Sequence, residues 1–242
     1  MKIISPKVSV IVATYNDEIE SLQKTIDSVK SQTYKNWEIV IVDSGECGIK
    51  NSQNIKMVKT PPKGVADALN KGLEQASGDY VYVIGAGDYL WSDDVLEKMM
   101  EGADPEIDML LCGRINRTTE DGKTVLYTST LNLKKWMMIY KMGYPHQGLF
   151  TSRKYFDKYG IFDVNCIFAM DYDLLLRAYK EFPEVVLKDV VVAAWRAGGV
   201  GKGRINKVID EYHQIRLKNK IAPKIVLWAV YLLTKLRYIF IK

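Results

Sequence analysis

Apolar residues in the first third of the chain follow two different spacings in turn. Residues 8–13 and 37–42 are short runs rich in β-branched residues without helical spacing, which predicts strands covered on both faces. Between these runs, residues 18–32 carry apolar side chains at helical spacing, namely Leu22, Ile26 and Val29. The three segments together predict one βαβ unit.

The alternation continues as far as residue 84. Residues 56–59 predict a short third strand, residues 65–76 a helix with one apolar stripe, and residues 80–84 a fourth, buried strand. Strands and helices that alternate at this rhythm predict an α/β fold with a mostly parallel, Rossmann-like sheet flanked by helices. In such a sheet, ligands bind beyond the carboxyl ends of the strands.

Polar residues follow three of the four predicted strands. Thr14 and Tyr15 follow the first strand, Asp43 follows the second, and Gly87 and Asp88 follow the fourth. Because the carboxyl ends of parallel strands meet at one edge of a sheet, we expect these residues to surround one crevice.

The ligand expected in this crevice is a nucleoside diphosphate. The first strand is followed by T-Y-N-D rather than G-x-G-x-x-G, so this turn lacks the glycines that bind a dinucleotide. Asp88 with Mn²⁺ or Mg²⁺ would balance the charge of a diphosphate, and Gly87 allows close approach of the backbone. Asp43 would accept from a ribose hydroxyl or a base N–H, and Tyr15 would flank the base.

A series of short motifs runs through the chain in a fixed order. They are V-I-V-A-T-Y-N at 10–16, I-V-I-V-D at 39–43, G-V-A-D-A-L-N-K-G at 64–72, A-S-G-D-Y at 76–80, P-H-Q at 145–147, G-I-F-D at 160–163, A-M-D-Y-D-L-L-L-R at 169–177 and R-A-G-G-V at 196–200. Together they resemble the family 2 glycosyltransferases, which have the GT-A fold. The resemblance implies inverting transfer of a sugar from a nucleotide sugar, usually UDP-linked, with a divalent metal ion.

The resemblance also implies roles for residues of the donor site. Thr14, Tyr15 and Asp43 would bind the nucleoside, and Asp88 would be the metal-binding acid. The family usually shows two adjacent acids at this place, whereas this chain has Gly87 before Asp88. Asp67, on the predicted helix, is a further candidate donor contact, although a solvated helix face explains it equally well.

Asp171 matches the catalytic base of the family. A carboxylate at that place takes the proton of the acceptor hydroxyl as its oxygen attacks the anomeric carbon, which inverts the anomeric centre. The alternative is that Asp171 or Asp173 caps a helix predicted over residues 174–179. His146 lies either near the sugar or acceptor, or hydrogen-bonds within its own loop.

Composition narrows the possible classes of function. The chain has 242 residues, 48% of them hydrophobic, which predicts a folded globular protein. Its net charge is only +5 and it has no long basic run, so we do not expect it to bind nucleic acid. Its three cysteines have no C-x-x-C spacing, which argues against a disulfide framework and a zinc site and favours a reduced, cytoplasmic setting. The apolar run near the N-terminus is too short for a signal peptide.

The last 20 residues, 223–242, predict a terminal helix that starts at Pro223. Its longest uncharged stretch is ten residues, which is too short to cross a bilayer. Helical geometry places one set of residues on a narrow face, namely Lys220, Lys224, Tyr231, Lys235 and Lys242. A second set points away from it, namely Ile225, Trp228, Leu232 and Ile239. This amphipathic pattern fits a helix in the headgroup region of an anionic membrane, and the alternative is packing on the domain or on a second subunit in a homodimer.

We therefore expect a GT-A-like domain over residues 1–205, with a nucleotide-sugar half at 1–100 and an acceptor half at 101–205, and a helical tail at 206–242. The hypothesis is transfer of a hexose or N-acetylhexosamine from a nucleotide sugar to a glycan or lipid-linked glycan, in polysaccharide biosynthesis at the cytoplasmic face of the membrane. Two alternatives stay open. They are a nucleotidyltransferase and a non-catalytic, membrane-attached protein that binds a nucleotide sugar.

Overall fold

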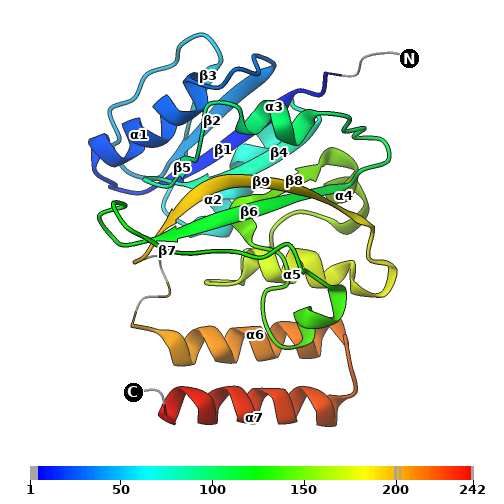
Figure 1. Ribbon diagram of the computed structural model, residues 1–242. Helices are drawn as coiled ribbons and strands as arrows, with labels where there is room; N and C mark the ends of the chain where they lie inside the picture. The colour runs from blue at the N-terminus through cyan, green and yellow to red at the C-terminus, as the bar shows by residue number, and fades with distance from the viewer. Residues whose placement is uncertain (1–4, 199–200, 202, 241–242) are drawn as a thin grey trace.

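One mixed sheet runs through the part of the chain that the computed structural model describes, residues 5–198, 201 and 203–240 (Figure 1). Its strands are β1 (Val8–Thr14), β2 (Trp37–Asp43), β3 (Ile55–Lys59), β4 (Tyr80–Gly85), β5 (Tyr89–Leu90), β6 (Leu110–Thr118), β7 (Val125–Thr128), β8 (Leu149–Ser152) and β9 (Val185–Arg196). The α-helices are α1 (Ile19–Lys30), α2 (Val65–Gln75), α3 (Val95–Met100), α4 (Arg153–Tyr159), α5 (Met170–Arg177), α6 (Ile205–Asn219) and α7 (Lys224–Phe240). Three 3₁₀ turns join them, η1 (Lys135–Ile139), η2 (His146–Gly148) and η3 (Tyr179–Glu181).

The strand order is β3-β2-β1-β4-β8-β6-β9-β5, with β7 paired to β6. Strands β3, β2, β1 and β4 are parallel, as are β6 and β9, and these ladders hold most of the paired residues. The predicted α/β fold with a mostly parallel sheet is therefore confirmed. The second half is more mixed than the first, because β8 runs antiparallel to both β4 and β6, and β5 runs antiparallel to β9.

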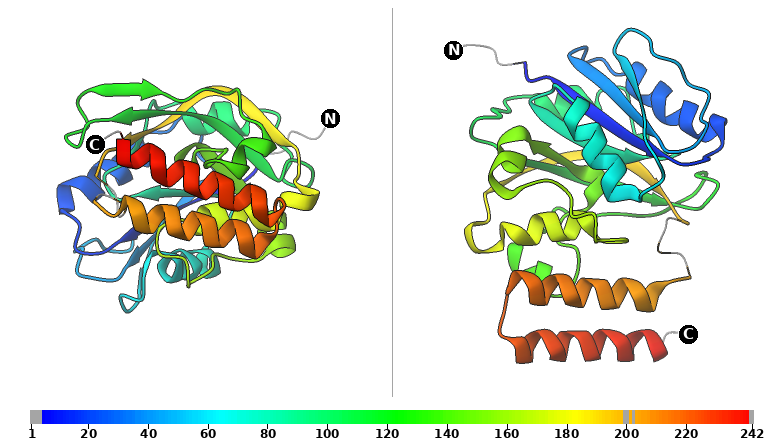
Figure 2. Two further views of the ribbon diagram at one scale, coloured as in Figure 1. Left: turned by 90° about the horizontal axis from the view of Figure 1, so that it is seen from below. Right: turned by 180° about the vertical axis from the view of Figure 1, so that it is seen from behind.

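Helices cover both faces of the sheet, as the continuous apolar runs in its strands require. On β2, Ile39 and Ile41 pack in the core with α1 and α3, whereas Val40 and Val42 pack in the core with α2 and α5. Figures 1 and 2 show α1 and α3 on one side of the sheet and α2 and α5 on the other. Every residue of β2 is buried, so neither face of this strand meets solvent.

The last two helices form further layers beyond α5. Figures 1 and 2 show α6 between α5 and α7, with α7 outermost and antiparallel to α6. Helix α6 starts at Ile205, and the predicted division into a domain and a tail at this place stays a prediction. Arg216 of α6 is buried and donates through Nε to the hydroxyl of Tyr172 on α5 at 2.9 Å. This helix is therefore anchored in the core of the domain.

The predicted lysine face of the tail is partly packed against α6, and Lys220 does not belong to it. Lys220 is not in the terminal helix, because it ends α6 with a left-handed backbone at φ 49°. The hydroxyl of Tyr231 and the ammonium of Lys235 both contact Asp210 of α6, at 2.9 and 2.7 Å. Asp210 thus holds Tyr231 and Lys235 against the neighbouring helix, whereas Lys224 of the same predicted face is exposed. Lys242 lies outside the described residues.

The helices of the described residues include none that is both long and apolar enough to cross a bilayer.

Candidate functional site

The carboxyl ends of β1, β2 and β4 lie side by side at one edge of the sheet. Thr14 at the end of β1 pairs with Asp43 at the end of β2, and Ala13 pairs with Gly85 at the end of β4. The three polar clusters that follow these strands in the sequence therefore start from neighbouring backbone positions. This edge is where an open α/β sheet binds its ligand.

Asp43 is fully buried at this edge, and its carboxylate is held by its own loop. Oδ1 accepts from the backbone N–H of Gly45 at 2.8 Å, and Oδ2 accepts from the N–H of Cys47 at 3.0 Å and from Nζ of Lys59 at 2.5 Å. Burial by itself raises the pKa of Asp43, but these hydrogen bonds outweigh it and lower the pKa to about 2. Asp43 is thus ionised, and it fixes the loop that follows β2.

The turn after β1 leaves an aromatic ring exposed. Asp17 accepts through Oδ2 from the hydroxyl of Thr14 at 2.9 Å and from the backbone N–H of Tyr15 at 3.1 Å. Asn16, between Tyr15 and Asp17, has a left-handed backbone with φ 53°. The side chain of Tyr15 is 59% exposed, so its ring is available to flank a planar ligand such as a base.

Asp67 lies in the first turn of α2, where the chain has just left the end of β3. It is half-buried, and its place near the same edge of the sheet is compatible with a donor contact. Two neighbours have other roles. Asn70 is buried and exchanges hydrogen bonds with the backbone N–H and C=O of Phe162, at 2.9 and 2.8 Å, and Lys71 pairs with Glu74 at the surface.

The loop after β4 is fixed by hydrogen bonds from two sides. Thr25 of α1 accepts from the N–H of Gly87 at 2.8 Å and donates to the C=O of Asp88 at 2.6 Å. From β9, the N–H of Arg196 donates to Oδ1 of Asp88 at 2.9 Å. Burial raises the pKa of Asp88 to about 6, against the charges of Arg196 and Arg117, which lower it.

The residues around Asp88 do not fit a divalent cation held by two carboxylates. Gly87 stands where the resemblance leads us to expect a second acid. Its backbone has φ +90°, and a Cβ added there would clash with the guanidinium of Arg196. A cation therefore lies against the position of the expected acid. Sequence reasoning did not assign a role to Arg196, although this residue begins the R-A-G-G-V motif.

Asp171 lies in the first turn of α5, with its side chain partly exposed. Oδ1 accepts from the N–H of Tyr172 at 2.8 Å, and Oδ2 lies 3.9 Å from Nδ1 of His146 on η2. The two side chains share a small cavity of about 10 Å³, roughly the room for one water molecule. Val81 and Val83 of β4 line this cavity as well. Asp171 thus approaches the strand that leads to Asp88, from the face that α5 covers.

Asp88 is not among the residues that line this cavity. Thr25 of α1 bonds to its main chain and Arg196 of β9 to its carboxylate, so the structure does not bring the two acids into one cavity. A shared site for Asp88 and Asp171 therefore stays a prediction.

The expectation that Asp171 or Asp173 caps a helix over residues 174–179 is wrong. The helix starts at Met170, so both acids lie inside its first turn, and neither is the N-cap residue. Glu211 of α6 provides the cap instead. Its carboxylate accepts from the backbone N–H groups just before α5, which are Ile167 at 3.0 Å, Phe168 at 2.8 Å and Ala169 at 2.7 Å.

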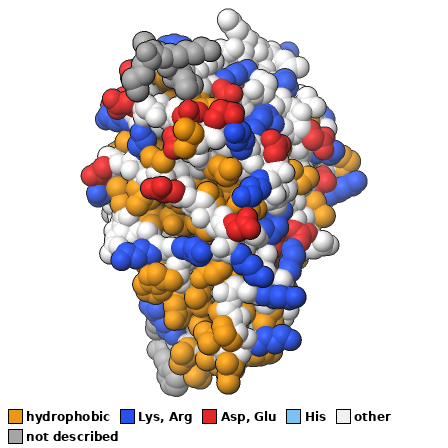
Figure 3. Space-filling view, turned by 90° about the vertical axis from the view of Figure 1, so that its right-hand side faces the viewer, with side chains coloured by type: hydrophobic (Ala, Val, Ile, Leu, Met, Phe, Trp, Pro, Cys, Tyr) orange, Lys and Arg blue, Asp and Glu red, His pale blue; other side chains and the backbone are white. Residues whose placement is uncertain are grey.

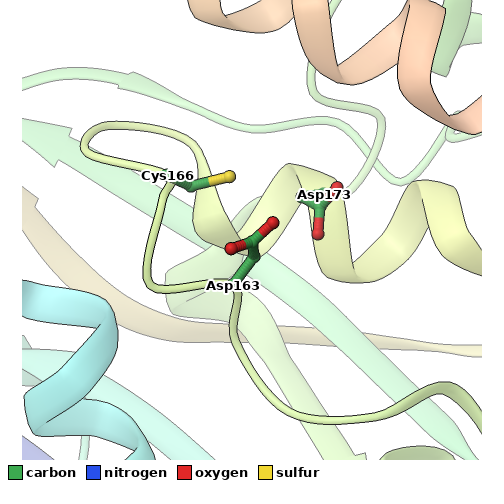
Figure 4. A group of neighbouring side chains, drawn as sticks. All are labelled: Asp163, Cys166 and Asp173. Carbon is green, nitrogen blue, oxygen red and sulfur yellow. The ribbon is translucent and has the colours of Figure 1, made fainter.

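A second acidic group lies beside α5, formed by Asp163, Cys166 and Asp173 (Figure 4). Lys218 of α6 bridges its two carboxylates, with Nζ 2.6 Å from Asp163 and 3.1 Å from Asp173. Burial raises the pKa of the Cys166 thiol to about 12, so the sulfur is neutral. Lys218 and Arg177, whose Nε lies 3.1 Å from Asp173, already balance the two carboxylates, and we assign no metal to this group.

Comparison with known proteins agrees with this geometry. The family model described as Glycosyl transferase family 2 matches residues 9–170. A PGL/p-HBAD biosynthesis glycosyltransferase of Mycobacterium tuberculosis is 26% identical over 227 residues, which cover 88% of this chain and 84% of the relative. A putative glycosyltransferase of Bacillus subtilis, EpsH, is 29% identical over 130 residues, and the match spans 50% of this chain but 37% of EpsH.

Two solved structures share the fold. TarS 1-349 of S. aureus aligns with a TM-score of 0.65 and 18% identity, over 93% of this chain and 70% of TarS. The mannosyltransferase PcManGT of Pyrobaculum calidifontis, in complex with GDP-Man and Mn²⁺, aligns with a TM-score of 0.64 and 20% identity, over 94% of this chain and 69% of PcManGT. The GT-A-like fold is thereby confirmed, and the family match over residues 9–170 shows that the chain belongs to glycosyl transferase family 2.

Proposed function

We propose that this protein is an inverting glycosyltransferase that moves a hexose or N-acetylhexosamine from a UDP-linked sugar to a glycan or lipid-linked glycan, in polysaccharide biosynthesis. The observation that carries the proposal is the family match, which includes nearly all of β1, all of β2 and β4, and ends at Met170, one residue before Asp171. The solved complexes of TarS with UDP and with UDP-GlcNAc support a UDP-linked donor. The complex of PcManGT with GDP-Man makes a GDP-linked donor the alternative.

In this proposal the donor lies at the edge formed by β1, β2 and β4. Tyr15 flanks the base, and Asp43 and Asp67 border the nucleoside. Asp171 accepts the proton of the acceptor hydroxyl while the acceptor oxygen bonds to the anomeric carbon. The bond from that carbon to the diphosphate breaks on the opposite side, and the nucleoside diphosphate leaves with the electron pair.

Support for a divalent metal ion comes from a structural neighbour and not from the residues around Asp88. The Mn²⁺ complex of PcManGT supports a metal ion, and Asp88 is the residue predicted to bind it as Mn²⁺ or Mg²⁺. A Mg²⁺ ion commonly uses one or two carboxylates together with substrate phosphate oxygens. Because the neighbours of Asp88 are Arg196 and Arg117 rather than a second acid, we route no step of the transfer through a metal.

The test of the catalytic role is Asp171→Asn. We expect transfer to fall at least about 100-fold, since a general base contributes about 10²–10⁴-fold, while affinity for the nucleoside diphosphate stays within about twofold. Asp157→Asn, on an exposed position of α4, is the matched control and should retain full transfer. Turnover by Asp171→Asn at the wild-type rate would remove Asp171 from the mechanism.

The donor is found by screening UDP- and GDP-sugars for thermal stabilisation, with and without Mn²⁺. A ligand that binds only the folded state raises the apparent stability with the logarithm of its concentration above Kd, so the donor should stand out from the panel. Release of inorganic diphosphate from a nucleoside triphosphate would favour a nucleotidyltransferase. Donor binding without turnover, across a broad acceptor panel, would favour the non-catalytic binder.

The tail supports a place at a membrane surface. The outward side of α7 is apolar over several turns, with exposed fractions of 79% for Ile225, 55% for Leu232 and 49% for Leu236. Figure 3 shows hydrophobic side chains gathered at the end of the molecule that α7 forms, with Lys and Arg side chains beside them. Helical geometry places Lys224 and Arg237 on opposite borders of this apolar side.

We assign this face to an anionic bilayer, at the cytoplasmic surface of the membrane. Apolar residues bordered by basic ones suit the headgroup region, where acyl chains and anionic phosphates lie close together. A lipid-linked acceptor would meet the enzyme there. The alternative occupant of the same face is a second copy of this chain.

Vesicle co-sedimentation tests the assignment. We expect binding to vesicles that contain phosphatidylglycerol, weaker binding to pure phosphatidylcholine, and at least a tenfold loss when Trp228, Leu232 and Leu236 are together changed to Gln. Ile107→Gln, which removes an apolar side chain that is 76% exposed elsewhere, is the control. Equal binding by the triple variant, or a dimer in solution that the triple variant abolishes, would overturn the membrane assignment.

A further inference from the structure

The guanidinium of Arg196 lies over the loop that follows β4. Pairing of β5 with β9 brings Ala194 opposite Tyr89, and this register places Arg196 beside the loop. The main chain of Arg196 is then held by Asp88 at 2.9 Å. Gly87 has no side chain, and the guanidinium fills the space that a Cβ would need.

The donors of this guanidinium are only loosely used. Nη1 lies 3.5 Å from the hydroxyl of Ser21, and Nη2 lies 3.5 Å from the C=O of Ala86. Both distances are at the outer limit of a hydrogen bond, where normal values are about 2.7–3.2 Å. Arg196 is also only partly buried, so a ligand at this edge of the sheet can reach its N–H groups.

Two further cations lie close to Arg196. Arg117 of β6 donates to the C=O of Arg196 at 3.1 Å and stacks on the ring of Trp195, with 3.5 Å between its Cζ and the ring centroid. The second cation is Lys24 of α1. Its pKa is lowered by burial first and by the charge of Arg196 second. Two arginines thus lie beside the carboxylate of Asp88, with Lys24 close to one of them, and such a group attracts an anion more strongly than it attracts a divalent metal ion.

We propose that Arg196 binds the diphosphate of the nucleotide sugar and stabilises the charge of the departing nucleoside diphosphate, at the place that Gly87 leaves open. This inference rests on the proposed function. The bond between the anomeric carbon and the β-phosphate oxygen breaks, and its electron pair stays on that oxygen. The Nη–H groups of Arg196 donate to the phosphate oxygens as this charge develops, while the acceptor proton passes to Asp171.

The inference explains why the position before Asp88 is a glycine. An aspartate there would clash with the guanidinium and would also neutralise the charge that the diphosphate needs. Arginine suits the task because its planar fork binds phosphate oxygens in pairs and stays charged at every pH of interest.

Calorimetry with UDP, GDP, uridine and guanosine tests the inference in EDTA, so that no divalent metal contributes. We expect the wild type to bind the matching nucleoside diphosphate and Arg196→Met to bind it about 10–100-fold more weakly, while Arg196→Lys recovers part of the loss. Affinity for the matching nucleoside, which is uridine for UDP or guanosine for GDP and carries no phosphate, should change less than twofold. Arg114→Met, half-buried on β6 and paired with Asp189, is the matched control.

The outcomes separate this inference from the proposed function. If the wild type binds neither UDP nor GDP, with or without Mn²⁺, the proposed function fails and the inference fails with it. If a diphosphate binds the wild type and Arg196→Met equally well, the inference alone is wrong. An equal loss for the diphosphate and for the matching nucleoside would show that Arg196 only supports the loop, and would also overturn it.

Discussion

The carboxylate of Glu211 should contribute a measurable part of the stability of the α5 region. Glu211→Ala removes the acceptor of three backbone N–H groups just before α5, and nothing in the local sequence replaces it. Ala169 is the residue just before the helix, and its N–H has no partner inside the helix, so an acceptor from outside is needed there. Asp171 lies two residues beyond the last of these groups, Ala169.

The size of the effect follows from the burial of each N–H group. Ala169 is fully buried, and a buried donor without a partner costs about 1–3 kcal/mol. Phe168 is half-buried and loses about 0.5–1.5 kcal/mol, whereas Ile167 is 60% exposed and can bond to water at little cost. The free energy of unfolding should therefore fall by about 2–4 kcal/mol in Glu211→Ala.

Glu211→Gln is the matched variant. Its remaining carbonyl oxygen can still accept from Phe168 and Ala169, which both bond to Oε1 in the wild type. Only the negative charge and the bond to the exposed Ile167 are lost, so the cost should be about 1 kcal/mol. Urea unfolding, followed by far-UV circular dichroism, gives both values from the shift of the midpoint at constant slope. A Glu211→Ala midpoint equal to that of Glu211→Gln would refute the role of the carboxylate as a cap.

Two further predictions concern stability. The pKa of Asp43 is about 2 in the folded chain against 3.8 ordinarily, so its contribution of about 2 kcal/mol is complete above pH 4 and disappears as the pH falls toward 2. Asp43→Asn should flatten the pH dependence of the unfolding free energy in this window, and an unchanged profile would contradict the assignment. Asn70→Ala should lower the free energy of unfolding by about 2–4 kcal/mol, because both backbone groups of the buried Phe162 lose their partner. Lys71→Ala, on the surface of the same helix, is the control and should lower it by less than about 1 kcal/mol in the same urea titration.

The first half of the fold could be predicted from the sequence because the spacing of apolar residues within each segment determines its secondary structure. The run from Trp37 to Val42 is apolar except for Glu38, and Leu22, Ile26 and Val29 line one face of a helix. The two periods therefore separate strand from helix. The strand ends then place Thr14 and Asp43 side by side, because parallel strands in register end at the same edge.

The rest depends on contacts between distant residues, which no local pattern contains. The start of α5 was missed because its cap, Glu211, lies 42 positions beyond Ala169. The place of Arg196 depends on a bond to Asp88, 108 positions earlier. In the tail, helical spacing correctly grouped Tyr231 with Lys235. Their contact with the neighbouring helix depends on Asp210, which the spacing within the tail does not include.

The three cysteines have a practical consequence. Cys47, Cys112 and Cys166 are all buried, and burial raises the pKa of each thiol, to about 12 for the last two. Maleimides and nitroxide reagents attack the accessible thiolate, so the unaltered chain should resist them under native conditions. A single cysteine introduced at Ile225 would then carry a probe alone, and its collision rate with oxygen or a nickel chelate would report how deeply that helix enters a bilayer.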